Sequence, residues 1–269
     1  MANALLLEPL EWASIAASDT ATGYSVDNLG PIGGIEMMGM VWRTNAGAAA
    51  RSLTIDLGGD KAVDTILVLG LYGAEAGWTW SIDLATAAQG AFSGSFWAGS
   101  AETLLAGSVM PVGGLGKALW QAPGGAPAVA RYVRINFPAH GTAAVEASRV
   151  VVAGKIQLER NFRFGAALGI RPLGKMDFSI RGVPLGRKGK KLRGLGISFP
   201  HIYRDEVEAA VMPLLERVGN DTAVSIVQDP AADSQRQNRI WHGYLTGNLG
   251  STWARPGGFQ ADFNLIALD

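Results

Sequence analysis

Residues whose side chains could perform catalysis or bind metal are few and scattered in this chain. The three histidines are His140, His201 and His242, and no two of them have the spacing of metal ligands. The chain has no cysteine, which excludes disulfides and thiolate metal sites. It also has no Gly-X-Ser-X-Gly, no His-Glu-X-X-His and no EF-hand loop. We therefore predict a protein that is not an enzyme and has no cofactor and no metal.

One group of carboxylates leaves two interpretations open. Asp56, Asp60 and Asp64 lie within nine residues and could supply the oxygen ligands of a divalent cation. The same spacing is typical of solvated residues in a strand–turn–strand segment, because Gly58 and Gly59 provide a turn between them.

A second cluster is basic and rich in glycine, and it occupies residues 186–194. It lacks the spacing and the Ser or Thr of a phosphate-binding P-loop, and no aromatic residues are interleaved for stacking on nucleic acid. We predict a hairpin whose side chains meet water or an acidic partner subunit. The candidate assembly residues are Arg187, Lys188, Lys190, Lys191 and Arg193.

Charge is balanced over the 269 residues but unequal between the two halves. Residues 1–154 contain 7 Lys and Arg against 12 Asp and Glu, and residues 155–269 contain the remaining 16 against 11. A net charge of zero gives no general attraction to nucleic acid or to anionic membranes. The N-terminus lacks the pattern of a signal peptide, and no apolar stretch has the roughly 20 residues that span a bilayer. We expect no nucleic-acid partner and no membrane insertion.

Alternation of apolar and polar residues predicts that residues 1–154 form an antiparallel β-sandwich of the jelly-roll type. Leu53, Ile55 and Leu57 alternate with polar residues, and many glycine-rich turns separate such segments. Residues 63–71 are almost wholly apolar, which is typical of a strand buried on both faces.

Residues 155–269 have the pattern of an α+β module with one packed helix. Residues 204–218 place apolar side chains on one helical face, Pro213 lies inside, and Gly219 follows the end. Alternating strands surround this helix. We expect the last strand, residues 259–268, to be a free edge that can add to a neighbour's sheet.

The N-terminal module resembles the galactose-binding-like, or discoidin (F5/8 type C), fold over residues 12–154. The resemblance rests on the order Leu-Thr-Ile-Asp-Leu-Gly, Val-Asp-Thr-Ile, Arg-Tyr-Val-Arg-Ile and Val-Glu-Ala-Ser-Arg-Val-Val-Val-Ala-Gly. It implies ligand-binding loops at one end of the sandwich, here within residues 23–42, 73–78 and 91–97. The carbohydrate-binding candidates are Tyr24, Trp42, Trp78 and Trp97, which are alternatively core or protein-interface residues.

The C-terminal module is similar to minor tail and distal tail (baseplate) proteins of long-tailed bacteriophages. The similarity rests on Asp229-Pro230, on Gly243-Tyr244-Leu245 and on residues 263–268. It implies a structural component of the virion tail, assembled in the cytoplasm of a bacterial host. The implied partners are tail tube, hub and fibre proteins, in a homo-oligomeric ring. The alternative is a carbohydrate-binding module that recognises a host-surface glycan.

Overall fold

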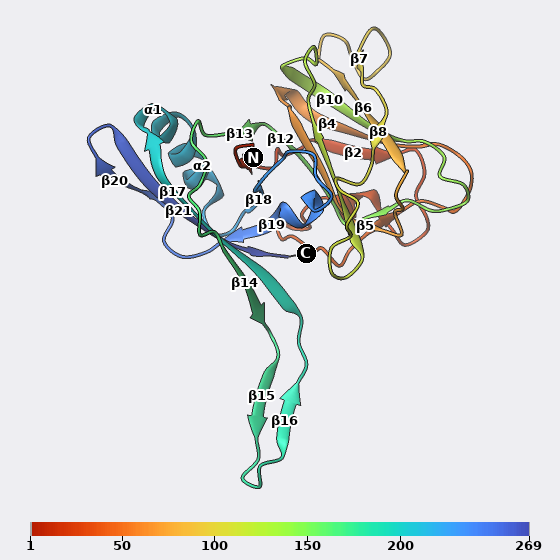
Figure 1. Cartoon of the computed structure of the whole chain (residues 1–269). Coiled ribbons are helices and arrows are strands. Elements are labelled where there is room, and N and C mark those ends of the chain that lie inside the picture. The colour runs from red at the N-terminus through yellow and green to blue at the C-terminus, as the bar shows by residue number, and fades with distance from the viewer. Residues whose placement is uncertain (1, 269) are drawn as a thin grey trace. The chain divides into compact units, whose positions relative to one another are not determined.

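The computed structural model describes residues 2–268, which form two compact units (Figure 1). The first unit comprises the chain up to Ile156 together with Val227–Ile240. The second comprises Gln157–Ile226 and the chain from Trp241 onward. The chain therefore returns once to the first unit, through residues 227–240.

The first unit is built almost entirely from strands and short 3-10 turns. Its elements are β1 (Leu5–Leu7), β2 (Ser14–Ala17), η1 (Val26–Leu29), β3 (Trp42–Arg43), β4 (Arg51–Ala62), β5 (Thr65–Tyr72), β6 (Thr79–Ala85), β7 (Trp97–Ala98), β8 (Glu102–Thr103), β9 (Leu115–Gln121), β10 (Val129–Phe137), β11 (Glu146–Ala147), β12 (Arg149–Ala153), β13 (Lys155–Ile156) and η3 (Arg236–Arg239).

Two antiparallel sheets form the sandwich of this unit. The larger has the order β2-β4-β10-β6-β7, with β8 also paired to β6, and the smaller has the order β12-β5-β9. Inward-facing residues of both sheets belong to one buried cluster, which includes Ile55 of β4, Val68 of β5 and Val133 of β10. The predicted mainly β, antiparallel sandwich is confirmed, because alternate residues of these strands are buried as the sequence pattern requires.

The small sheet is covered on both of its faces. Ile66 and Val68 of β5 face the sandwich core, whereas Leu67 and Leu69 belong to a second buried cluster. That cluster also contains Leu5, Leu7, Val227 and Ile240, from the N-terminal strand and the returning segment. The prediction that residues 63–71 form a strand buried on both faces is confirmed, and the second layer explains why nearly every residue there is apolar.

Polar contacts hold the returning segment, residues 227–240, in the first unit. The fully buried Gln237 accepts a 2.8 Å hydrogen bond from the backbone N–H of Lys117. The ammonium group of Lys117, whose side chain is also buried, donates a 2.7 Å hydrogen bond to the carbonyl of Ile240. A buried charge is tolerated there because hydrogen bonds replace those it would make to water.

The second unit combines one sheet, one helical segment and a long hairpin. Its elements are β14 (Ala167–Pro172), β15 (Lys175–Phe178), β16 (Pro184–Arg187), β17 (Lys191–Tyr203), α1 (Arg204–Glu206), η2 (Val207–Val211), α2 (Met212–Val218), β18 (Ala223–Val227), β19 (Ile240–Leu245), β20 (Ser251–Arg255) and β21 (Gly258–Ala267).

The helical segment runs from Arg204 to Val218, as the sequence predicts, and confirms an α+β module with one helix in the described part of the chain. Its middle, η2, has π-helical hydrogen bonding, and Pro213 lies at the start of α2. Because proline lacks an N–H and clashes with the carbonyl four residues earlier, a wider turn before it removes the conflict. Gly219 ends the helix with φ of 53°. Within residues 2–268 no helix is long and apolar enough to cross a membrane.

The prediction for the last strand was wrong. Strand β21 pairs with β17 on one side and with β19 and β20 on the other, so it lies inside the sheet. Its alternate apolar residues, which include Phe263 and Leu265, are buried on one face. The alternation that suggested a free edge is therefore the pattern of a half-buried interior strand.

Strand β14 lies instead at an edge of this sheet, and it continues outward as the long hairpin. We call residues 167–191 the arm. Strand β14 pairs with the first half of β17, and β15 pairs with β16. The chain turns at Ser179–Gly182, where the N–H of Gly182 donates to the carbonyl of Ser179. Figure 1 shows the arm, in green, extending away from the helical segment and from β20 of its own unit.

Candidate functional site

The predicted basic hairpin is one side of this longer arm. The turn was expected within residues 186–194 but lies at Ser179–Gly182, so the basic run occupies the return strand. The basic run does not form a turn because β16 continues into β17 after a short irregular stretch. In this stretch residues 188–190 lie opposite residues 173 and 174, so one strand of the hairpin has one extra residue.

The five basic candidates differ in their surroundings. Arg187, Lys188 and Lys191 are exposed on the arm, and Lys190 donates a 2.9 Å hydrogen bond to the carbonyl of Leu268. Arg193 lies beyond the arm, with its guanidinium 4.0 Å from the centre of the Trp241 ring. Burial lowers the pKa of Arg193, which nevertheless remains cationic. Arg193 therefore packs against the sheet of the second unit, whereas the other four basic side chains are accessible to a partner.

The arm exposes large apolar side chains along its whole length. Eight of them are between 54% and 104% exposed, namely Leu168, Ile170, Leu173, Met176, Phe178, Ile180, Val183 and Leu185. Single exposed apolar residues are ordinary on protein surfaces, but a continuous set of this size is not.

These side chains follow the pleat of the outgoing strand. Leu168, Ile170, Met176 and Phe178 all occupy even positions, and alternate residues of a strand share one face. The odd positions between them include Arg171, Lys175 and Asp177. We call Leu168, Ile170, Met176 and Phe178 the apolar stripe. On the return side Leu185 lies opposite Asp177, so exposed apolar side chains are present on both faces of the arm.

Two of the predicted carbohydrate-binding residues are core side chains, which corrects the sequence-based prediction for them. Trp42 is 0% exposed, its ring lies 6.3 Å from that of Phe137, and its Nε1 donates to Thr20 Oγ1. Trp78 is 8% exposed and stacks on His140 at 4.3 Å with an interplanar angle of 5°. A sugar stacks on an open aromatic face, and the protein itself covers these rings.

The other two candidates are half-buried. The guanidinium of Arg43 lies 5.8 Å from the centre of the Tyr24 ring. Trp97 packs on Trp120 with ring centres 6.0 Å apart, and it lies opposite Leu84 in the β6–β7 ladder. Each keeps part of its ring accessible, so a role in binding remains a prediction for Tyr24 and Trp97.

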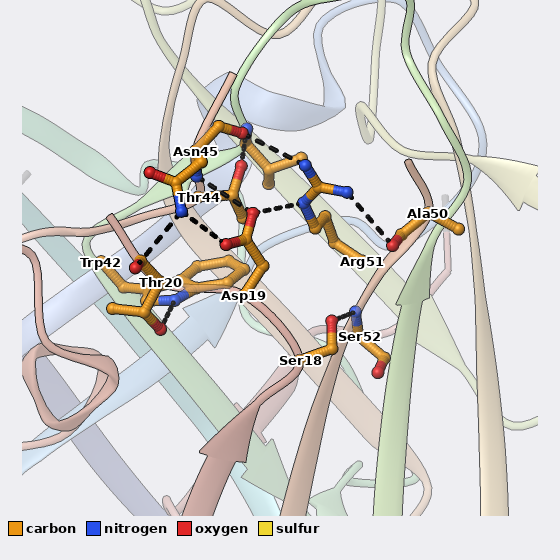
Figure 2. A network of polar contacts seen from close by, with 10 residues as sticks. Ser18, Asp19, Thr20, Trp42, Thr44, Asn45, Ala50, Arg51 and Ser52 are labelled. Carbon is orange, nitrogen blue, oxygen red and sulfur yellow. Dashed lines mark hydrogen bonds and ion pairs between the residues drawn. The ribbon is translucent and has the colours of Figure 1, made fainter. Parts of the chain in front are cut away.

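A polar network fixes the loop between β3 and β4 (Figure 2). The carboxylate of Asp19 accepts hydrogen bonds from the side chain and the backbone N–H of Asn45, at 2.7 and 3.1 Å. It also pairs with Arg51 at 2.5 Å. The Asn45 hydrogen bond, supported by Arg51, lowers the pKa of Asp19 against a smaller effect of desolvation. Because these contacts join residues far apart in the sequence, the network holds the loop in one conformation.

A cluster that the sequence did not reveal lies on the outer face of the large sheet. Arg134 of β10 donates two hydrogen bonds to Asp83 Oδ2, at 2.8 and 3.0 Å. Its guanidinium also lies 4.3 Å from the ring of Phe92 and 5.0 Å from that of Phe96. Asn136 donates to the same carboxylate oxygen at 2.9 Å. We call these five residues the Arg134 cluster.

Backbone strain at Phe92 is a reason why this cluster could not be predicted from the sequence. Phe92 has φ of 60°, and it is the one non-glycine residue with positive φ among residues 2–268. A bulky side chain in this region is uncommon and requires support from its surroundings. That support comes from the edge-to-face contact with Phe96 at 5.3 Å and from Arg134. The spacing of two phenylalanines in a glycine-rich segment was the only available signal.

The carboxylates considered for a cation do not converge. Asp56 binds Arg131 at 2.8 and 3.0 Å, Asp60 accepts from the N–H of Ala87, and Asp64 accepts from Lys155 N–H. In the described part of the chain no three His, Asp or Glu side chains form a group that could hold a metal ion.

The three histidines also lie apart, in three different settings. His140 stacks on Trp78, His201 makes an edge contact with Tyr203, and the buried His242 lies 2.9 Å from Ser225 Oγ.

Comparison with known proteins gives structural similarity only. No protein-family model matches the chain, and no curated protein sequence matches it. Among solved structures, chitosan-binding module 1 from a chitosanase/glucanase of Paenibacillus sp. IK-5 aligns with 55% of this chain and 99% of its own, at 14% identity and a TM-score of 0.39. The CBM32 of AlyQ, in complex with 4,5-unsaturated mannuronic acid, aligns with 54% of this chain and 96% of its own, at 20% identity and a TM-score of 0.36.

A third similar structure is a larger enzyme. The Ruminococcus gnavus GH29 fucosidase aligns with 53% of this chain at 15% identity and a TM-score of 0.39, and the match covers 25% of the fucosidase chain. Because all three TM-scores lie below 0.5, these similarities carry no argument about what this chain binds.

Proposed function

We propose that this protein is a structural, non-catalytic subunit of a multi-protein assembly and that it joins the assembly through its arm. The observation that supports this most directly is the row of eight exposed apolar side chains on residues 167–191. Strands β15 and β16 pair only with each other among the described strands, so the outer part of the arm receives no support from a protein core. A segment of this kind is stabilised when another protein covers it.

The size of the exposed surface favours a protein partner. If each of the eight side chains contributes about 100 Å² of apolar area, the arm exposes on the order of 800 Å². The largest apolar patch of a typical monomer is about 300–600 Å². A standard protein–protein interface buries about 800 Å² on each partner. The arm therefore offers as much surface as one side of a stable interface needs.

The assembly that we propose is the tail tip or baseplate of a long-tailed bacteriophage. This finer assignment rests on the resemblance of residues 155–269 to minor tail and distal tail proteins. It makes tail tube, hub and fibre proteins the expected neighbours and a homo-oligomeric ring the expected state. The protein would then be part of the virion tail and would be assembled in the host cytoplasm.

Shortening the arm tests this function. Residues 175–187 are replaced by Asn-Gly, a two-residue turn that closes hairpins. Light scattering after size-exclusion chromatography measures the mass of the parent and of the shortened chain, each alone and mixed with purified tail tube and hub proteins. We expect the parent to associate and the shortened chain not to. Equal association of both chains would contradict the proposal.

Carbohydrate binding is a second candidate function, supported by the Arg134 cluster. Two half-exposed phenylalanine rings lie beside Asp83, Arg134 and Asn136, and saccharides are bound by such combinations of ring faces and planar polar groups. A glycan array of the parent, followed by titration of any hit, tests this function. Binding that disappears in Phe96→Ala and persists in Tyr24→Ala places the glycan on the cluster, and the reverse places it on the loop of Tyr24. A parent that binds no glycan excludes this candidate.

A further inference from the structure

We infer that the partner of the arm is the N-terminal sandwich of a second copy of this chain, so that copies associate arm to sandwich. The inference rests on the proposed function, because it names the partner of the same surface. It depends on the distribution of charge and on a second group of exposed apolar residues.

The charge of the arm selects between possible partners. Residues 167–191 contain seven Lys and Arg and one Asp, which gives a net charge of 7 − 1 = +6, and all eight charged side chains are exposed. Residues 1–154 contain 7 Lys and Arg and 12 Asp and Glu, a net charge of 7 − 12 = −5. The arm and the first 154 residues therefore have net charges of opposite sign, which favours their association.

The same charge disfavours the pairing of two arms. Two arms would bring charges of +6 and +6 together, and like charges in contact disfavour an interface. An arm-to-sandwich contact also differs from an arm–arm contact in symmetry. It joins different surfaces of the two copies, so each copy keeps a free arm or a free sandwich for the next one. Contacts of this type produce closed rings or filaments.

The sandwich has exposed apolar residues of its own at one end of the small sheet. Tyr72 at the end of β5 is 62% exposed and lies opposite Leu115 of β9, which is 37% exposed. Val112, three residues before Leu115, is 108% exposed. The exposed carboxylate of Glu75 follows Tyr72 by three residues. We call these four residues the Tyr72 patch, and it combines apolar contact area with the negative charge that a basic arm requires.

Three double variants and one single variant test this inference in the chain of 269 residues. Met176→Ser with Phe178→Ser removes part of the stripe, and Tyr72→Ser with Val112→Ser removes part of the patch. Lys175→Ser with Asp177→Ser is the matched arm control, because it changes the opposite face of β15 and leaves the net charge unchanged. Ile35→Ser, at a residue that is 57% exposed elsewhere on the sandwich, is the patch control. All of these side chains are surface groups whose loss leaves the core intact, and that of Asp177 also accepts a local backbone hydrogen bond.

Mixing the two interface variants gives the decisive measurement. Each variant alone should be monomeric by mass photometry, with association weakened more than about tenfold. The mixture should form a heterodimer that does not grow, because one variant supplies an intact arm and the other an intact patch. Both controls should assemble like the parent, and a higher ionic strength should weaken the parent's assembly.

Other results would overturn the inference in distinguishable ways. A patch variant that associates by itself as the parent does indicates arm–arm pairing or a different receiving surface, and a mixture in which both variants remain monomeric shows that the arm and the patch do not bind each other. A parent that is monomeric alone, yet binds another tail protein through the arm, overturns this inference and leaves the proposed function intact. Loss of the stripe without effect on any association overturns both.

Discussion

The small sheet of the sandwich and the arm are both apolar β-structures, and their surroundings are opposite. Strand β5 has seven of its eight residues buried, between the sandwich core on one face and a layer containing β1 and residues 227–240 on the other. All residues of β14, β15 and β16 are exposed. The difference shows that apolar strand residues here serve two purposes: β5 is covered within the chain, whereas the arm is left for another molecule to cover.

The polar groups of the two regions follow the same division. In the first unit, charges that leave solvent are paired, as Arg149 is with Glu36 at 3.0 Å, where the side chains are 4% and 6% exposed. On the arm the charges remain in solvent and share a sign. The first arrangement fixes one folded state, and the second leaves electrostatic attraction available for association.

The largest effect that we expect comes from removing an aromatic ring from the sandwich core. Trp42→Ala should lower the free energy of unfolding by about 3–5 kcal/mol, because it leaves a cavity beside Phe137. Urea denaturation of the first unit, followed by tryptophan fluorescence and circular dichroism, measures it. A loss below about 1 kcal/mol would show that Trp42 does not contribute to the core.

Breaking the buried ion pair should cost nearly as much. Glu36→Gln removes the negative partner of Arg149, and an uncompensated buried charge costs about 3 kcal/mol. The matched control is Glu208→Gln, which breaks the Arg204–Glu208 pair whose side chains are 63% and 60% exposed. That change should cost less than about 0.5 kcal/mol. Similar losses in both variants would contradict the assignment of Glu36 and Arg149 to the interior.

The type of each element could be predicted from the sequence more accurately than its position in the sheet. The apolar run of β5 and the helical face of residues 204–218 were recognisable because each pattern has a single geometric solution. The position of β21 was not, since alternation is the same in an edge strand and in a half-buried interior strand.

The candidate site was harder to predict for a related reason. Proximity of an aromatic residue to a loop does not fix the direction of its side chain, so Trp42 and Trp78 proved to be buried. The exposure of the arm could not be predicted, because the sequence of a hairpin does not determine whether its strands pack on the rest of the protein. The Arg134 cluster depends on a left-handed backbone at Phe92, which no residue type there requires.

A smaller effect should come from acid. Desolvation lowers the pKa of His140, although a backbone hydrogen bond with Thr79 opposes this, so the fold favours the neutral ring stacked on Trp78. The stabilisation is complete above the unfolded pKa of about 6.5 and is lost as the pH falls through the lower folded value. We expect a small loss of stability between pH 7.5 and pH 5, because the partly exposed ring is screened by solvent.

His140→Gln is the control for the acid effect, because glutamine does not titrate. Thermal melts of both proteins across this pH range measure the difference between them. If the variant loses as much stability in this window as the parent, the titrating group is not His140.

The smallest effect that we expect is on the stability of the arm itself. Phe178→Ala should change the free energy of unfolding by less than about 0.5 kcal/mol, because the ring is 65% exposed and touches no core. The same phenylalanine-to-alanine change at Phe137, which is 0% exposed, should cost about 3–5 kcal/mol. Urea denaturation of both variants in dilute, unassociated samples measures the contrast. If Phe178→Ala destabilises the monomer as strongly as Phe137→Ala, the arm is held against its own body, and its apolar stripe is not available to a partner.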